Sequence, residues 1–306
     1  MGEFLQYVIN GLALGAIYSL VALGLVVIYR GTGHLNFAQG EMALFATFCA
    51  WWIYDHGSTM WFAVIVAAIG AFVVGGVIEF GLMRPAGKKS PLAVVVVSIA
   101  MFQGLNSFTT LLFKGSADGL AFPSLFPNKP LDFFRLGDNT VWKYQDIGVL
   151  LTVLALTGGL FLLFQKTKVG LAMRMVANNP DSAKLVGVST TRTLMLSWGI
   201  SSALGAVAGA MIGGINTNIT TATMFEIFLL SSAAATLGGL DSPLGALVGG
   251  LSLGIIKSLV SHYPKDWVGS SYIGAQTAVA VAFIIILVVL VVRPSGLFGS
   301  SRVERV

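Results

Sequence analysis

Long apolar stretches alternate with short polar loops along this chain. A run of about 18 or more apolar residues predicts a helix that crosses a membrane. The pattern therefore predicts an all-α polytopic membrane protein, with about nine transmembrane or part-spanning helices in a single domain over residues 1–306. The expected segments are 7–29, 42–54, 61–83, 92–113, 147–164, 194–215, 224–240, 244–260 and 271–292.

Two of these segments are short, and a polar break precedes each. Residues 30–41 read RGTGHLNFAQGE before segment 42–54, and residues 216–223 read NTNITTAT before segment 224–240. A long helix, a polar break and a short helix thus occur twice, about 185 residues apart and in opposite directions. Such inverted halves, here roughly 1–165 and 193–306, are typical of transporters whose pathway lies between them. The alternative is a pair of glycine-kinked helices without a role in transport.

Composition narrows the class of protein. Hydrophobic residues make up 56% of the chain and charged residues 10%, whereas a soluble domain is about 25% charged. The mean hydropathy is +0.85. These values exclude a soluble enzyme, a nucleic-acid-binding protein and a secreted disulfide scaffold. The single cysteine, Cys49, lies in an apolar segment, where packing is its expected role.

The net charge of +5 comes from the loops, and it predicts the orientation. Cytoplasmic loops are enriched in Lys and Arg, so the three basic stretches and the C-terminus are expected on the cytoplasmic side. The stretch 114–146 has as many acidic as basic residues and is expected outside, as is the N-terminus. The basic stretches contain Arg84, Lys88 and Lys89; Lys166, Lys168, Arg174, Lys184 and Arg192; and Arg293, Arg302 and Arg305.

Charged residues inside the apolar segments are candidates for function, because each is costly in lipid. Glu41 and Glu226 begin the two short segments, where the helix dipole favours a carboxylate. For Glu41, capping of the helix is the alternative to a role in the pathway. Lys257 is expected to extend its side chain to the outer interface.

Two common motifs for phosphate and zinc binding are absent from the sequence. It contains no G-x-x-x-x-G-K-[ST] loop and no H-E-x-x-H. His34, His56 and His262 do not have the spacing of metal ligands. We therefore expect no catalytic, cofactor-binding or metal-binding residue in this chain.

The basic stretch 166–192 predicts a short helix between two spans. Pro180 and Asp181 mark its start and Gly187 its end. Ala183, Leu185 and Val186 would give it an apolar patch suited to a groove on a cytoplasmic partner. An ordinary basic loop is the alternative.

Several blocks of the sequence together resemble the permease subunits of branched-chain amino-acid ABC importers of the LivH type. The resemblance extends over nearly the whole length and depends on the order and spacing of these blocks. They are residues 22–29 (ALGLVVIY), 35–42 (LNFAQGEM), Glu79 with Arg84 and Pro85, residues 169–170, Arg174, residues 185–187, residues 237–246 (LGGLDSPLGA) and residues 293–299 (RPSGLFG).

This resemblance implies one half of a pore, paired with a second, LivM-like permease in a heterodimer or with a second copy in a homodimer. Two cytoplasmic ATPase subunits would bind ATP and Mg²⁺, and an extracytoplasmic solute-binding protein would deliver the solute. The membrane would be a prokaryotic plasma membrane. Segment 179–187 would be the coupling helix, and the coupling residues would be Gly170, Arg174, Pro180, Asp181, Ala183, Leu185 and Gly187.

The paired breaks indicate which residues line the pathway. We expect Asn36, Phe37, Gln39, Gly40 and Glu41 from one half, and Asn216, Thr217, Asn218, Ser231 and Ser232 from the other. Two positions depart from the family pattern. Gln39 replaces a usual His, and residues 230–232 (LSS) replace a frequent Lys-Ala-Phe. Branched-chain amino acids are the default cargo, while urea, short amides and organic acids stay open.

The main alternative is a stand-alone secondary transporter or channel, in which Glu41 or Glu226 would bind a coupling ion. A membrane enzyme is a third and less favoured alternative.

Overall fold

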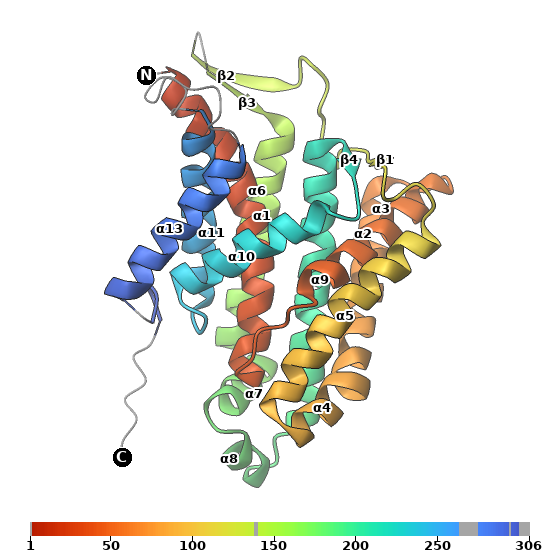
Figure 1. The fold of residues 1–306 in the computed structure, drawn as a ribbon, viewed down its shortest axis with the longest axis vertical. Helices are drawn as coiled ribbons and strands as arrows, with labels where there is room; N and C mark the ends of the chain where they lie inside the picture. Colours follow the sequence, from red (N-terminus) through yellow and green to blue (C-terminus); the bar gives the residue numbers. More distant parts are fainter. Residues whose placement is uncertain (1, 138–139, 263–274, 294, 300–306) are drawn as a thin grey trace.

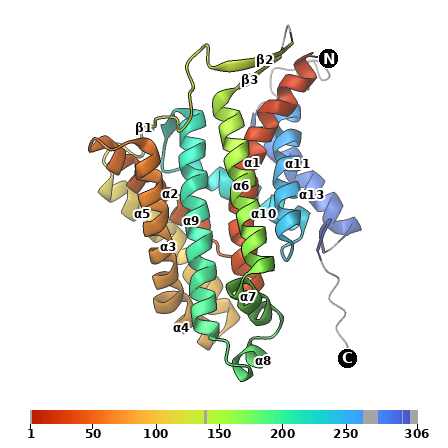
Figure 2. The ribbon, with the colours of Figure 1, turned by 180° about the vertical axis from the view of Figure 1, so that it is seen from behind.

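The computed structural model describes residues 2–137, 140–262, 275–293 and 295–299 as a helical bundle with two small β-ribbons (Figures 1 and 2). In chain order the elements are α1 (Gly2–Thr32), α2 (Gln39–Asp55), α3 (Met60–Ile78), the π-helix η1 (Glu79–Met83), α4 (Arg84–Lys89), α5 (Pro91–Leu112), β1 (Leu120–Ala121), β2 (Phe133–Gly137), β3 (Thr140–Lys143), α6 (Tyr144–Lys166), α7 (Lys168–Asn178), α8 (Pro180–Leu185), α9 (Thr190–Asn216), β4 (Asn218–Ile219), α10 (Thr223–Gly238), α11 (Pro243–His262) and α13 (Ala275–Val292).

The all-α polytopic architecture is confirmed. Each predicted apolar segment coincides with a helix where the structure describes it, although residues 271–274 of the ninth lie outside the described residues. Six helical stretches in the described part of the chain are long and apolar enough to cross a membrane. The number of nine segments across the membrane and the inverted relation of the two halves stay predictions.

The centre of the bundle is α1, which is the most deeply buried of the six long helices. Its glycines allow a close contact with α11, because a Cβ at Gly254 of α11 would overlap the backbone of Gly15. Small residues permit such approach where no hydrophobic force acts between helices. α9 is the second most buried span. Together α1 and α9 form the scaffold that holds the short helices.

The two short helices lie within this scaffold rather than beside it. α2 begins after the turn at residues 33–38, and α10 passes obliquely across the middle of the bundle in Figure 1. Both are bounded at their start by the polar breaks that the sequence indicates. The first turn of α2 is buried, whereas that of α10 buries Met224 and leaves Phe225 and Glu226 exposed.

The two ends of the bundle differ in chemistry. α4, α7 and α8 lie at one end, whereas β1–β4 lie at the other end (Figure 1). The three helices contain Arg84, Lys88, Lys89, Lys168, Arg174 and Lys184. Segment 114–146 contains antiparallel strands β2 and β3, and β1 pairs with the distant β4. The first two basic stretches thus share one end, as the predicted orientation requires. Arg302 and Arg305 lie outside the described residues.

Candidate functional site

The turn before α2 is shaped by Asn36. Its Oδ1 accepts a hydrogen bond from the backbone N–H of Ala38 at 3.0 Å, and its Nδ2 donates to Gln39 Oε1 at 3.3 Å. An Asn side chain that bonds the backbone two residues later stabilises a tight turn. Asn36 is 2% exposed, while Phe37 is half-buried. Asn36 therefore fixes the point at which the chain turns from α1 into α2.

Gln39, the first residue of α2, connects this turn to α9. Its Nε2 donates to the carbonyl oxygen of Ser201 at 3.0 Å, and Ser201 Oγ donates to Gln39 Oε1 at 2.9 Å. Both side chains are fully buried. Ser201 was not among the residues that the sequence indicated, because nothing local to it marks α9 as the partner of α2.

Gly40 marks the crossing of the two short helices. A Cβ at this position would lie 2.8 Å from Cβ of Phe228 and 3.2 Å from the carbonyl oxygen of Met224, both in α10. Neither atom belongs to the flexible end of a side chain, so the crossing requires glycine on α2. The structure therefore brings the first turn of α2 directly against α10.

Glu41 is buried next to this crossing and bonds to α5. Asn106 Nδ2 donates to Glu41 Oε2 at 3.0 Å and to the carbonyl oxygen of Thr221 at 3.1 Å. Glu41 is fully buried, and its Oε1 has no hydrogen-bond partner among the described residues. Asn106 thus joins the first break to the second. Sequence reasoning missed it, although an amide in an otherwise apolar segment was the available signal.

Only part of the second polar break, residues 216–223, lies close to the first break, residues 30–41. Asn216, Thr217 and Asn218 are exposed at the end of α9, where Asn218 pairs with Ala121 of β1. Asn216 follows Ser201 by 15 residues along α9, which corresponds to about 22 Å at 1.5 Å per residue. These three residues therefore lie at the end with the β-ribbons and not with Gln39. Thr221 is the residue of this break that reaches the interior site.

Ser231 and Ser232 lie further along α10. Ser231 is fully buried, and its Oγ has no hydrogen-bond partner within the described residues. Ser232 is half-buried, and its Oγ donates to the carbonyl oxygen of Phe228 at 2.8 Å. Both lie within one or two helical turns of Phe228, so they belong to the region of the crossing.

Glu226 and Lys257 form an ion pair rather than two separate charges. Lys257 Nζ lies 2.5 Å from Glu226 Oε1 and also donates to the hydroxyl of Tyr18 at 3.2 Å. The expectation that Lys257 extends to the interface is wrong, because its side chain is only 13% exposed and its cation is held by α10 and α1. In the described part of the chain, no three His, Cys, Asp or Glu side chains come together as metal ligands.

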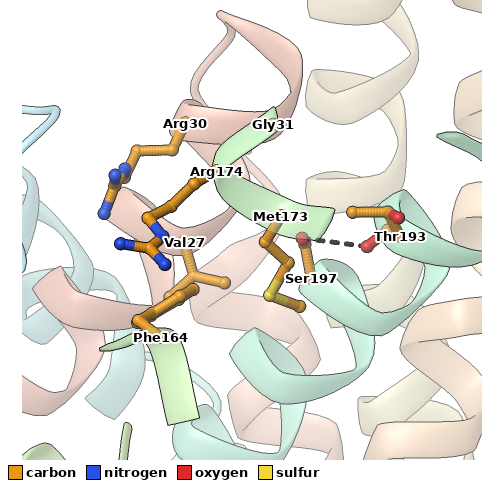
Figure 3. A pocket seen from close by; sticks show the side chains of 8 residues that line it. All are labelled: Val27, Arg30, Gly31, Phe164, Met173, Arg174, Thr193 and Ser197. Atoms are coloured by element: carbon orange, nitrogen blue, oxygen red, sulfur yellow. Dashed lines mark hydrogen bonds between the residues drawn. The ribbon is translucent and has the colours of Figure 1, made fainter. Parts of the chain in front are cut away.

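The basic end has a second set of predicted residues, on α7. Gly170 is buried, and a Cβ there would overlap the backbone of Leu163 and Phe164. Arg174 is half-buried, and its Nη1 donates to Gln165 Oε1 at 3.4 Å. Figure 3 shows Arg174 beside Arg30 in a closely packed junction that also includes Phe164 and Met173. α7 is thus anchored against α1, α6 and α9.

α8 follows as a short exposed helix, and its predicted bounds are confirmed. Asn179 Oδ1 caps it by accepting from the N–H groups of Asp181 and Ser182, both at 3.0 Å, and Pro180 occupies its first turn. Gly187 ends the segment with φ +83°. Of the expected apolar patch, Ala183 is buried, while Leu185 and Val186 are 89% and 65% exposed.

Known proteins resemble this chain over almost its whole length. Residues 7–292 match the family described as branched-chain amino acid transport system / permease component. The high-affinity branched-chain amino acid transport system permease protein LivH of Salmonella typhimurium is 31% identical over 99% of this chain and 98% of its own length. The corresponding protein BraD of Pseudomonas aeruginosa is 28% identical over 99% and 98%.

A solved structure supports the fold. PsaBC from Streptococcus pneumoniae, in complex with a Fab, matches with a TM-score of 0.51 and 15% sequence identity, covering 96% of this chain and 93% of that chain. At this identity the likeness concerns the fold alone. The family match and the LivH identity go further: the chain belongs to the branched-chain amino acid transport system permease family, and it is the multi-pass membrane permease component of an ABC importer.

Proposed function

We propose that the crossing of α2 and α10 forms this chain's share of a solute pathway, which a second, LivM-like permease or a second copy completes. The observation that supports it best is the contact of Glu41 with Asn106, which in turn bonds Thr221. Polar groups in the interior of a membrane protein are costly and mark substrate pathways. Asn36, Gln39, Gly40, Glu41, Ser231 and Ser232 belong to this region, while residues 216–218 belong to its outer mouth.

The names of the relatives support a proposal for the cargo and the energy source. LivH and BraD are named for branched-chain amino acids, so we propose the same cargo here, delivered by an extracytoplasmic binding protein. Two cytoplasmic ATPase subunits bind ATP and Mg²⁺, and this chain contributes no catalytic group. The membrane is a prokaryotic plasma membrane, with the C-terminus on the cytoplasmic side.

We propose α8 as the contact with the ATPase subunits. Leu185 and Val186 present an apolar surface at the basic end, while buried Ala183 ties α8 to the body of the protein. An exposed apolar tip on a short helix suits a groove on a partner. α7, packed between α1, α6 and α9, would transmit a displacement of α8 to the spans that hold α2.

Affinity purification of the intact membrane complex tests this assignment. Leu185→Ser should lower recovery of the ATPase subunits by about tenfold or more, because a central apolar anchor typically contributes about 2 kcal/mol. Leu131→Ser is the matched control, since Leu131 is 85% exposed in the segment between α5 and α6 at the opposite end. Equal recovery with both variants would contradict a role for α8 in docking.

A further inference from the structure

A cavity of about 310 Å³ lies at the basic end of the bundle, apart from the crossing of α2 and α10. Its walls come from the end of α1 and the following turn, from η1 and α4, and from the first turns of α5 and α9. Small-molecule sites in proteins begin at about this volume. The cavity is therefore large enough for a ligand of several heavy atoms.

The charged groups of this cavity favour an anion. Glu79 is held by Arg84, whose Nη2 and Nε donate to its two carboxylate oxygens at 2.6 and 3.2 Å. Lys88 has no acidic partner among the described residues. One positive charge on the lining thus remains without a counter-charge. A carboxylate or a phosphate is the group that would neutralise it.

One part of the remaining wall favours an aliphatic group. Leu35, Val94 and Leu194 line the cavity with branched hydrocarbon side chains. Trp198, which is 2% exposed, also belongs to the wall. These side chains would contact the hydrocarbon part of a ligand whose charged group lies at Lys88.

We propose that this cavity binds an oxyanion attached to a short aliphatic chain, with the anion at Lys88 and the hydrocarbon against Leu35, Val94 and Leu194. Two sources have this chemistry: an anionic phospholipid of the membrane and a small aliphatic carboxylate from solution. The site lies outside the crossing of α2 and α10 and shares Asn36 with the proposed pathway region. Because the turn with Asn36 forms one wall, a bound ligand would contact the segment that leads into α2.

Binding to the full-length protein in phosphatidylcholine nanodiscs tests the proposal with two probes. One arm measures retention of phosphatidylglycerol by native mass spectrometry, and the other measures equilibrium binding of radiolabelled isocaproate. Lys88→Gln should weaken binding of one probe about fivefold, which corresponds to about 1 kcal/mol for an exposed charge pair. The probe whose binding is weakened by Lys88→Gln identifies whether the ligand comes from the membrane or from solution.

Lys89→Gln is the matched control, because Lys89 is the next residue of α4, is exposed and does not line the cavity. It should leave both probes unaffected. Gly87→Leu is a second variant, since a Cβ at Gly87 would make an ordinary 3.6 Å contact with Val94 and the longer side chain would fill the cavity. It should weaken the same probe. Binding that is equal in all variants, or absent in both arms, would overturn the proposal.

Discussion

Gln39 and Ser201 exchange two hydrogen bonds across 162 positions of sequence, from the first residue of α2 to the middle of α9. This pair lies against α1, where a Cβ at Gly24 would come within 2.9 Å of Ser201 Oγ. Three helices thus meet at one buried polar contact. It holds the start of a short helix at a fixed depth in the bundle, which is what a pathway built on α2 requires.

Removing this contact should destabilise the fold measurably. Gln39→Leu abolishes both hydrogen bonds, together with the one that Asn36 Nδ2 donates to Gln39 Oε1. It should lower the free energy of unfolding by about 1–2 kcal/mol, since interhelical hydrogen bonds in membranes contribute about 0.6–1.7 kcal/mol each. Combined with Ser201→Ala, the double variant should lose less than the sum of the singles by at least about 0.5 kcal/mol. Denaturant unfolding in detergent measures all three. Additive losses would show that the pair does not interact.

Gly40 should be intolerant of even one added methyl group. Gly40→Ala places a Cβ against Phe228 and the Met224 carbonyl, and such overpacking costs about 1–3 kcal/mol. The expected result is a lower melting temperature and reduced uptake. Gly104→Ala in α5 is the control, because a Cβ there meets nothing within 4 Å. If both variants melted and transported alike, close packing at the crossing would be refuted.

The pair Lys257–Glu226 should behave as a unit. Glu226→Ala leaves the largely buried Lys257 cation without its counter-charge, at an expected cost of about 2–3 kcal/mol in unfolding free energy. Lys257→Met in the same background removes that charge and should restore most of the loss. The comparison is made by chemical unfolding. A double variant less stable than Glu226→Ala would contradict the interpretation.

α8 should be needed for coupling and not for the membrane fold. The Ala183 N–H donates to the Asn179 carbonyl at 3.0 Å, and Ala183→Pro removes this donor and disrupts the helix. The complex should then still hydrolyse ATP, but its uptake per ATP should fall about tenfold or more. Its melting temperature should stay unchanged. Ala183→Ser keeps the N–H and should retain coupling. If Ala183→Pro kept the normal uptake per ATP hydrolysed, α8 would have no role in coupling.

The broken helices could be predicted because their signal is local. Polar stretches interrupt apolar ones at residues 30–41 and 216–223, and both short helices begin within the last three residues of these breaks. α7 was missed in the basic segment, although its buried residues Gly170, Met173 and Val176 have the three-residue spacing of a helical face. The strands β2 and β3 were missed because few residues contribute to each.

The partners of the site residues could not be predicted in the same way. Asn106 lies 65 positions from Glu41, and Lys257 lies 31 positions from Glu226. Which helix faces which is decided by packing of small residues over the whole bundle, and no local pattern records it. For the same reason residues 216–218 were grouped with Asn36, although the length of α9 separates them from Gln39.

ATP-driven uptake by the reconstituted complex tests the central claim most directly. Proteoliposomes containing this chain, its partner permease, the ATPase subunits and the binding protein are supplied with labelled leucine, with ATP on the cytoplasmic face. Ionophores then dissipate all ion gradients. The account predicts uptake that requires ATP and continues without gradients. Uptake by this chain alone that needs no ATP and stops with the ionophores would contradict it and favour a secondary transporter.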